Sequence, residues 1–290
     1  MHHHELHDDF GGLHRDLDAT GAEMNRRGLF RLAARVGLGA GAMALTACSE
    51  SSPTAPSTSS TSSTTATTTM TPSSTGSTGT TGACATRIPE ETQGPYPGDG
   101  SNGPNVLTQS GVVRSDIRSS FAGLSGTAAG IPLTLTLTIV SASTCEPLAG
   151  RAIYLWHCDR EGRYSLYSSG ATNQNYLRGV QQADSSGRVS FTTIFPGCYA
   201  GRWPHMHFEV YPSLSAAASV ANKTATSQIA LPKDASDAVY ATTGYSQSVT
   251  NLSRITLQTD GIFSDGYALE LATAVGSPSM GYAATLTVAI

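Results

Sequence analysis

The run Leu133–Ile139, with the sequence LTLTLTI, alternates apolar and polar side chains along its whole length. Successive side chains of a β-strand point to opposite faces, so leucine and isoleucine would share one face and threonine the other. This period-two pattern is typical of a half-buried strand. We therefore predict a strand here, with its apolar face against a core.

Three further short runs continue the pattern on the C-terminal side. They are Ala152–Trp156, Val189–Ile194 and His205–Val210. Turn-forming residues precede them, at Thr144–Pro147, Asp184–Gly187 and Pro196–Gly197. Short strands with this punctuation predict an all-β fold, an antiparallel β-sandwich. No long amphipathic helix and no internal repeat is visible in this part of the sequence.

Composition limits the chain to one core and excludes one class of partner. The 290 residues are 39% hydrophobic and only 13% charged, which is enough apolar material for a single good core. The net charge is −4, and no basic cluster follows residue 84. A protein that tracks a phosphate backbone needs a basic stripe, so we expect no nucleic-acid partner.

Residues 1–47 have the features of an export leader. Asn25–Phe30 contains the paired arginines of a twin-arginine signal, and the apolar run Leu32–Leu45 is too short to stay in a membrane as a spanning helix. The leader ends in Leu45–Cys48, which resembles a lipobox, so Cys48 is the predicted lipidation site. An ordinary cleaved signal with an incidental cysteine is the alternative. We expect twin-arginine export to give a membrane-anchored lipoprotein facing the extracytoplasmic side, or a secreted protein.

Residues 48–83 differ from the rest of the chain in composition. They are almost entirely Ser, Thr, Pro, Gly and Ala, without apolar periodicity. Such a segment cannot bury enough apolar surface to offset the entropy of ordering. We predict a disordered tether here, followed by a folded domain over residues 84–290.

Four cysteines fall in the predicted domain, at Cys84, Cys145, Cys158 and Cys198. An even number in an exported domain favours two disulfides, and four cysteines allow three pairings. Free buried thiols are the alternative.

A cluster of histidines and tyrosines is the candidate site. His205 and His207 stand at i and i+2 on one predicted strand, so both imidazoles point to the same face. Tyr199 comes just after the break at Pro196–Gly197, and Tyr164 follows a turn. Two phenols and two imidazoles form a mixed oxygen and nitrogen donor set, which favours ferric iron over zinc. Taken singly, each residue is as well explained as a core or surface aromatic.

Three stretches of sequence resemble the intradiol dioxygenases, the family of protocatechuate 3,4-dioxygenase and catechol 1,2-dioxygenase. They are Glu91–Tyr96, Trp156–Tyr164 and Pro196–Phe208, the last with the sequence PGCYAGRWPHMHF. The resemblance is strongest to an exported branch of single-domain members. It covers most of the chain from Cys84 to about Leu231, with weaker support beyond.

This resemblance implies an iron site. Its Fe(3+) would be held by Tyr164, Tyr199, His205 and His207, with Tyr199 and His207 axial and the other two equatorial beside a bound hydroxide. Tyr167 is close enough in sequence to compete with Tyr164 as the ligand. The spacing from Trp156 favours Tyr164.

The resemblance also implies the residues of the substrate pocket. Arg202, Tyr199 and Gln228 would be catalytic, and Tyr96, Arg202 and Gln228 would contact the substrate. Ala200–Gly201 replaces an aromatic residue that some members carry, so the sequence does not name the diol. Four neighbours are given no catalytic role: His157, Asp159, Glu161 and Arg178.

The implied activity is cleavage of catechol-type aromatic diols between the two hydroxyl-bearing carbons to muconate-type diacids. A small aromatic diol and O2 would be the partners, and the sequence leaves open whether the chain forms a homo-oligomer. A non-catalytic β-sandwich binding module on a lipoprotein stalk is the alternative function. The joint presence of two tyrosines, two histidines and Arg202 favours the enzyme.

The positions of the thiols beside the candidate ligands suggest one disulfide pairing. Cys158 stands near Tyr164 and Cys198 directly precedes Tyr199, so a Cys158–Cys198 bridge would join the two tyrosine-bearing segments. Cys84 and Cys145 would then form the second pair.

Overall fold

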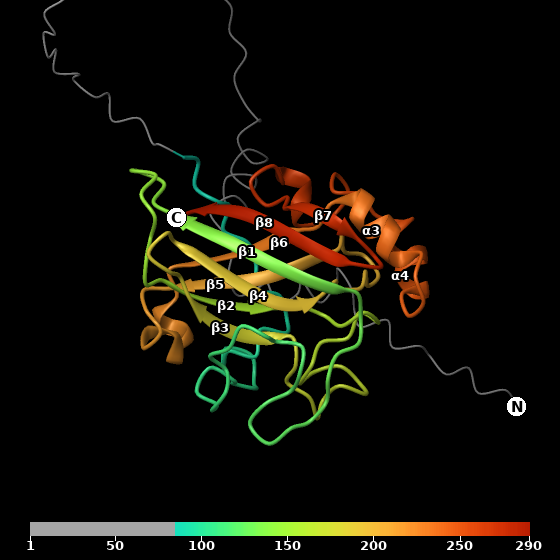
Figure 1. The fold of residues 1–290 in the computed structure, drawn as a ribbon, viewed down its shortest axis with the longest axis horizontal. Helices are drawn as coiled ribbons and strands as arrows, with labels where there is room; N and C mark the ends of the chain where they lie inside the picture. Colours follow the sequence, from blue (N-terminus) through green and yellow to red (C-terminus); the bar gives the residue numbers. More distant parts are fainter. Residues whose placement is uncertain (1–84) are drawn as a thin grey trace, which may run out of the picture.

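The structure is a computed structural model that describes residues 85–290 (Figure 1). The predicted leader, the lipidation site Cys48 and the tether lie outside the described residues, and so does Cys84. Within residues 85–290, no helix is long and apolar enough to cross a membrane.

Two four-stranded sheets form the body of the described chain (Figure 1). The first sheet has the order β4-β1-β8-β7, with the strands β4 (Arg188–Ile194), β1 (Pro132–Val140), β8 (Gly281–Ala289) and β7 (Thr273–Ser277). The second sheet has the order β3-β2-β5-β6, with the strands β3 (Arg178–Gln182), β2 (Ala152–Trp156), β5 (His205–Tyr211) and β6 (Ala225–Ala230). Neither sheet closes on itself, so the predicted β-sandwich is confirmed in outline.

Strand β1 matches the alternation seen in the sequence. Its leucines and Ile139 are fully buried, while its threonines are exposed or half-buried. It pairs antiparallel with β4, where Leu135 lies opposite Phe191. Its other neighbour, β8, runs parallel to it, with Leu135 opposite Ala284. The prediction of a purely antiparallel sandwich was therefore wrong for this pair, because β8 lies far from β1 in sequence and shows no hairpin connection to it.

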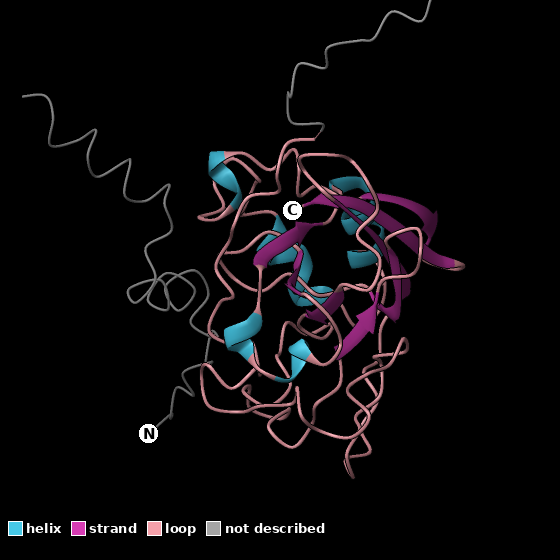
Figure 2. Ribbon diagram, turned by 90° about the vertical axis from the view of Figure 1, so that its left-hand side faces the viewer, coloured by secondary structure: helices cyan, strands magenta, loops and turns pink. Residues whose placement is uncertain are grey.

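Strand β5 is buried on both faces, and this positions the site. Met206, Phe208 and Val210 belong to the large hydrophobic core that also contains the apolar face of β1. The alternate residues, His205 and His207, point to the opposite face of the same strand. Every residue of β5 is buried, so this second face is covered too. Long loops surround the strands in Figure 2.

Short helices complete the described chain. Two are α-helices, α3 (Lys233–Tyr240), which lies beside β7, and α4 (Ser246–Leu252), which lies beside α3 (Figure 1). Three are single 3₁₀ turns, η2 (Ala216–Ala218), η3 (Val220–Asn222) and η4 (Phe263–Asp265). The two α-helices are each only about two turns long, too short to give a clear apolar period in the sequence.

The predicted Cys158–Cys198 bridge was wrong, because both thiols are free and buried. The Cys158 thiol points to the carbonyl of Gly197 at 3.5 Å, and the Cys198 thiol points to the carbonyl of Arg202 at 3.3 Å. Burial raises the pKa of both thiols, so each stays protonated. Cys145 is disulfide-bonded, but its predicted partner Cys84 falls outside the described residues, so that pairing stays a prediction.

Candidate metal centre

The two histidines of β5 are held rigidly by their neighbours. Trp156 of β2 lies directly opposite His207, and the two rings stack with centroids 5.1 Å apart and planes within 7°. His205 has its Nδ1 atom 2.5 Å from the carbonyl oxygen of Trp203. A hydrogen bond from Nδ1 to this carbonyl leaves Nε2 of His205 as the acceptor.

Two tyrosines from different loops reach the same point as these imidazoles. The Oη atom of Tyr164 lies 3.2 Å from Nε2 of His207, and the Oη atom of Tyr199 lies 3.1 Å from Nε2 of His205. The two Nε2 atoms are themselves 3.2 Å apart. All four side chains are buried. The structure therefore brings together the four residues that the sequence singled out as ligands.

The loops that carry the tyrosines pack tightly against one another. Gly162 has φ +83°, and a Cβ atom there would lie 3.1 Å from Cβ of Tyr199. Helix α4 fixes the residue before Tyr199, because Ser248 accepts a hydrogen bond from the amide of Cys198 and Asn251 donates one to its carbonyl. Glycine at position 162 and the helix α4 thus bring Tyr199 close to Tyr164.

The electrostatics keep the imidazoles neutral. Burial lowers the pKa of His205 and of His207 well below the usual value, and the nearby guanidinium of Arg202 lowers both further. A neutral imidazole is the form that donates a lone pair to a metal.

The donor chemistry fits a trivalent ion better than zinc. Among residues 85–290, no group of three or more His, Cys, Asp or Glu side chains could hold a metal ion. The oxygen atoms that the structure places beside the two imidazoles are the phenol oxygens of Tyr164 and Tyr199. Phenolate oxygen is a hard anionic donor, which suits a small, highly charged ion.

Tyr167, the competing tyrosine, lies in a different place. Its hydroxyl accepts a hydrogen bond from the amide of Gly98 at 2.9 Å and donates one to the carbonyl of Asn102 at 3.3 Å. It therefore binds the segment that precedes β1, whereas Tyr164 reaches His207.

Arg202 and Gln228 lie beside the four ligand candidates, as predicted. Nη2 of Arg202 donates to Oε1 of Gln228 at 2.6 Å, and Nη1 of Arg202 lies 3.4 Å from Nε2 of His205. Gln228 stands on β6 directly opposite His207, and its Nε2 donates to the carbonyl of Thr92 at 2.9 Å. Both side chains are fully buried.

Tyr96 lies over Tyr164, with ring centroids 4.9 Å apart. Its segment is held by Arg178 of β3, whose guanidinium donates to the carbonyls of Tyr96 and Pro97 at 2.9 and 2.7 Å. From the sequence, Arg178 had no role beyond a possible place at the pocket rim. Its structural role is to hold Tyr96 in place.

The remaining neighbours are structural. His157 is buried between the hydroxyl of Thr193 and the carbonyl of Cys158. Asp159 accepts hydrogen bonds from Arg163 and from the hydroxyl of Tyr176, which hold the turn before Tyr164. Ala200 and Gly201, by contrast, are exposed.

One buried carboxylate at the site was not foreseen. Asp260 accepts a hydrogen bond from Nε of Arg202 at 3.0 Å and is fully buried. It stands in an Asp-Gly pair, which the sequence alone would mark only as a turn.

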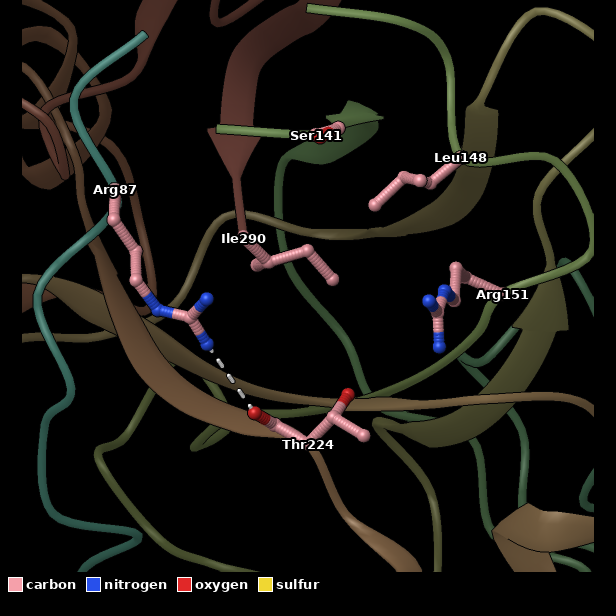
Figure 3. Close-up of a pocket in the computed structure, with 6 residues that line it drawn as sticks. All are labelled: Arg87, Ser141, Leu148, Arg151, Thr224 and Ile290. Atoms are coloured by element: carbon pink, nitrogen blue, oxygen red, sulfur yellow. Dashed lines mark hydrogen bonds between the residues drawn. The ribbon is translucent and has the colours of Figure 1, made fainter. Parts of the chain in front are cut away.

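A cavity of about 270 Å³ lies away from these residues (Figure 3). Arg87 and Arg151 enter it from opposite sides, and the chain end at Ile290 lines a third side. The guanidinium of Arg87 donates to the carbonyl of Thr224 at 3.5 Å. None of the metal or pocket candidates lines this cavity.

Comparisons with known proteins agree with the geometry. A family model described as "Dioxygenase" matches residues 103–233, a range that contains the four ligand candidates together with Arg202 and Gln228. The solved structure of an intradiol ring-cleavage dioxygenase from Tetranychus urticae is 26% identical, with a TM-score of 0.56, over 71% of this chain and 94% of that chain. A second solved dioxygenase is 25% identical, with a TM-score of 0.57 and the same coverage. The matched range, the fold and the convergence of two tyrosines on two histidines lead to one assignment: the chain belongs to the intradiol ring-cleavage dioxygenase family.

Proposed function

We propose that this ring-cleavage dioxygenase uses ferric iron, held by Tyr164, Tyr199, His205 and His207, to open catechol-type diols between their two hydroxyl-bearing carbons. One observation carries the proposal. The reactive atoms of the four side chains converge, with neighbouring atoms 3.1 to 3.2 Å apart, in a buried setting. When bound, ferric iron would supply a Lewis acid that draws electron density from a chelated diol.

Each protein residue near the centre would then have its own task. The phenolate oxygen of Tyr199 would accept a proton from one diol hydroxyl as the substrate binds. Nη1 of Arg202 lies 3.4 Å from Nε2 of His205. From this position the guanidinium would stabilise the negative charge that develops on the substrate. Gln228 holds Arg202 on one side, and Tyr96 covers the phenol of Tyr164.

The reaction would take up both atoms of O2 and release a muconate-type diacid. A binding module on a stalk is the competing function. A binding module would have no reason to bury an arginine and two neutral histidines beside two tyrosines. Removing a charged group from water costs free energy, and a protein keeps such a group where the charge has a task. We therefore favour the enzyme.

Turnover by the purified full-length protein tests the proposal. Catechol should drive oxygen uptake, and mass spectrometry under ¹⁸O2 should find a ring-opened diacid with two labelled oxygen atoms. His207→Ala should abolish uptake. Iron-loaded protein that cleaves neither catechol nor a carboxylated catechol would contradict the proposed activity.

We also propose that the chain is exported and anchored. The proposal rests on the twin-arginine run Asn25–Phe30 and on Cys48 at the end of Leu45–Cys48. The Ser/Thr-rich residues 48–83 would then separate the catalytic domain from the membrane.

A further inference from the structure

The cavity shown in Figure 3 lies at the opposite end of the second sheet from the candidate metal centre. Arg151 directly precedes β2, whose last residue, Trp156, stacks on His207. Thr224 likewise directly precedes β6, the strand that carries Gln228. The five residue steps from Arg151 to Trp156 span about 16 Å along an extended strand, so the cavity is a site separate from the metal centre.

Positive charge enters this cavity from two sides. Arg87 and Arg151 reach into it from opposite sides, and none of the described residues that line it is acidic (Figure 3). Arg87 donates one hydrogen bond, to the carbonyl of Thr224 at 3.5 Å, and lies 3.8 Å from the carboxylate of Glu90. Both members of this ion pair are about half exposed, so the pair is weak.

The guanidinium of Arg151 has more capacity still. Among residues 85–290, no oxygen atom accepts a hydrogen bond from it and no carboxylate forms an ion pair with it. A guanidinium has five N–H donors, so most of the donors of Arg87 and all those of Arg151 can bind an anion.

Apolar side chains also line the cavity. Leu148 and Ile290 are half-buried and pack against the large hydrophobic core, which holds them in place. The main chain of Ile290 is fixed as well, because its amide donates to the carbonyl of Val140 at 3.0 Å and its oxygen accepts from the amide of Ala142 at 2.9 Å. A hydrocarbon chain in the cavity would bury apolar surface against these two side chains.

This lining suits a ligand with a carboxylate at each end and a hydrocarbon chain between them. A guanidinium can bind a carboxylate through two parallel N–H donors. A single inorganic anion would pair with the arginines but would make no use of the apolar walls. At about 30 Å³ for each water molecule, the cavity of about 270 Å³ has room for roughly nine small groups, enough for the chain of a six-carbon diacid.

We propose that this cavity is a binding site for linear dicarboxylates, in which Arg87 and Arg151 each pair with one carboxylate. Muconate-type diacids, the products of the proposed ring cleavage, belong to this class. The site would therefore hold product at a place where it does not block the metal centre. Only this link to the product rests on the proposed function, because the charges and walls of the cavity are independent of the reaction.

Calorimetry on the full-length protein at low salt tests the site with two probes. One is cis,cis-muconate, and the other is sorbate, which has the same diene chain but a single carboxylate. Muconate should bind at least about tenfold more tightly than sorbate, because only the diacid can pair with both arginines. Catechol added without oxygen should not displace muconate, since the two sites are separate.

Removal of either arginine should abolish the preference for the diacid. With Arg151→Gln or Arg87→Gln, the affinity for muconate should fall by about tenfold, to about that for sorbate, because one carboxylate loses its partner. If Arg151→Gln does not fold, Arg87→Gln alone decides, since the side chain of Arg87 is exposed. Arg254→Gln is the matched control: Arg254 is exposed, does not line the cavity, and should be replaceable without any change in the preference.

Four results would overturn the inference. They are a parent that does not bind muconate, equal affinity for muconate and sorbate, an unchanged preference in both cavity variants, and displacement of muconate by catechol. None of these measurements depends on turnover. A protein that binds muconate as described but cleaves no diol would instead contradict the proposed function, so the two failures are distinguishable.

Discussion

Tyr164 and Tyr199 approach the histidine pair from different loops, and this gives them different positions at the centre. Tyr164 contacts His207 and is covered by Tyr96, whereas Tyr199 and Arg202 both contact Nε2 of His205. Tyr199 therefore shares its histidine neighbour with the residue that would stabilise substrate charge. It is also the one we propose as the base.

Replacing each tyrosine by phenylalanine should separate these roles. Tyr199→Phe should keep part of its iron and colour through Tyr164 but turn over about 10²- to 10⁴-fold more slowly, the usual cost of losing a general base. Tyr164→Phe should lose more of the colour that persists when substrate is bound. Visible spectra and oxygen uptake would be measured on both.

Tyr167→Phe is the control for the pair, since its hydroxyl bonds to Gly98 and Asn102 away from the centre. It should keep the parental colour. A bleached Tyr167→Phe beside a fully coloured Tyr164→Phe would transfer the ligand role to Tyr167.

At the residue scale, the site residues that lie close together in the sequence could be predicted. Tyr199, His205 and His207 fall within nine consecutive positions, so their spacing indicated a possible shared site, and the family resemblance added Arg202, which lies between them. The partner of Arg202 could not be predicted in this way. Asp260 stands 58 residues later and meets Arg202 only through tertiary packing.

Among the elements, helix α4 shows how a short segment can hold a functional loop. It was not predicted, because seven residues give too little apolar period to be recognised. Its buried Ser248 and Asn251 bind the amide and the carbonyl of Cys198, next to Tyr199. The helix therefore positions Tyr199 without contacting the centre itself.

Asn251→Ala should loosen this loop. It leaves the buried carbonyl of Cys198 without its donor, which should lower the free energy of unfolding by about 1–3 kcal/mol. Urea unfolding would measure the loss, and the visible band should weaken as Tyr199 shifts. Thr250→Ala, exposed on the same helix, is the matched control. Equal stability and equal colour in the two variants would show that α4 does not hold the loop.

The strands that could be predicted are those with alternating apolar and polar residues or with turn-forming residues directly before them. Strands β1, β2, β4 and β5 were found within one residue of their ends. The other four strands, β3, β6, β7 and β8, were not predicted. The sequences of β3 and β6, RGVQQ and ATSQIA, mix polar and apolar residues without alternation. Their burial comes from the loops and from the site that they support, which no local pattern encodes.

Across the whole molecule, fold and site share one strand. Met206, Phe208 and Val210 of β5 belong to the core between the sheets, and His205 and His207 point to the other side. The catalytic face is thus held by the same packing that stabilises the sandwich. Residues 1–84 are not among the residues that the structure describes, and they contain the proposed export and anchoring signals.

Anchoring can be tested separately from catalysis. In a host with twin-arginine export, the parent should fractionate with membranes, and Cys48→Ser should appear in the soluble extracytoplasmic fraction with unchanged kcat. Replacing both Arg26 and Arg27 by lysine should keep the protein inside the cell. A parent that fractionates as a soluble protein, like Cys48→Ser, would exclude lipidation at Cys48.

The central claim is that two phenolates and two imidazoles hold ferric iron, and the most direct test is metal content measured together with the visible spectrum. Protein purified without added metal should contain about one iron per chain and be coloured, because tyrosinate-to-iron charge transfer absorbs visible light. The colour should change when catechol is added without oxygen. A colourless protein with one zinc per chain would contradict the account.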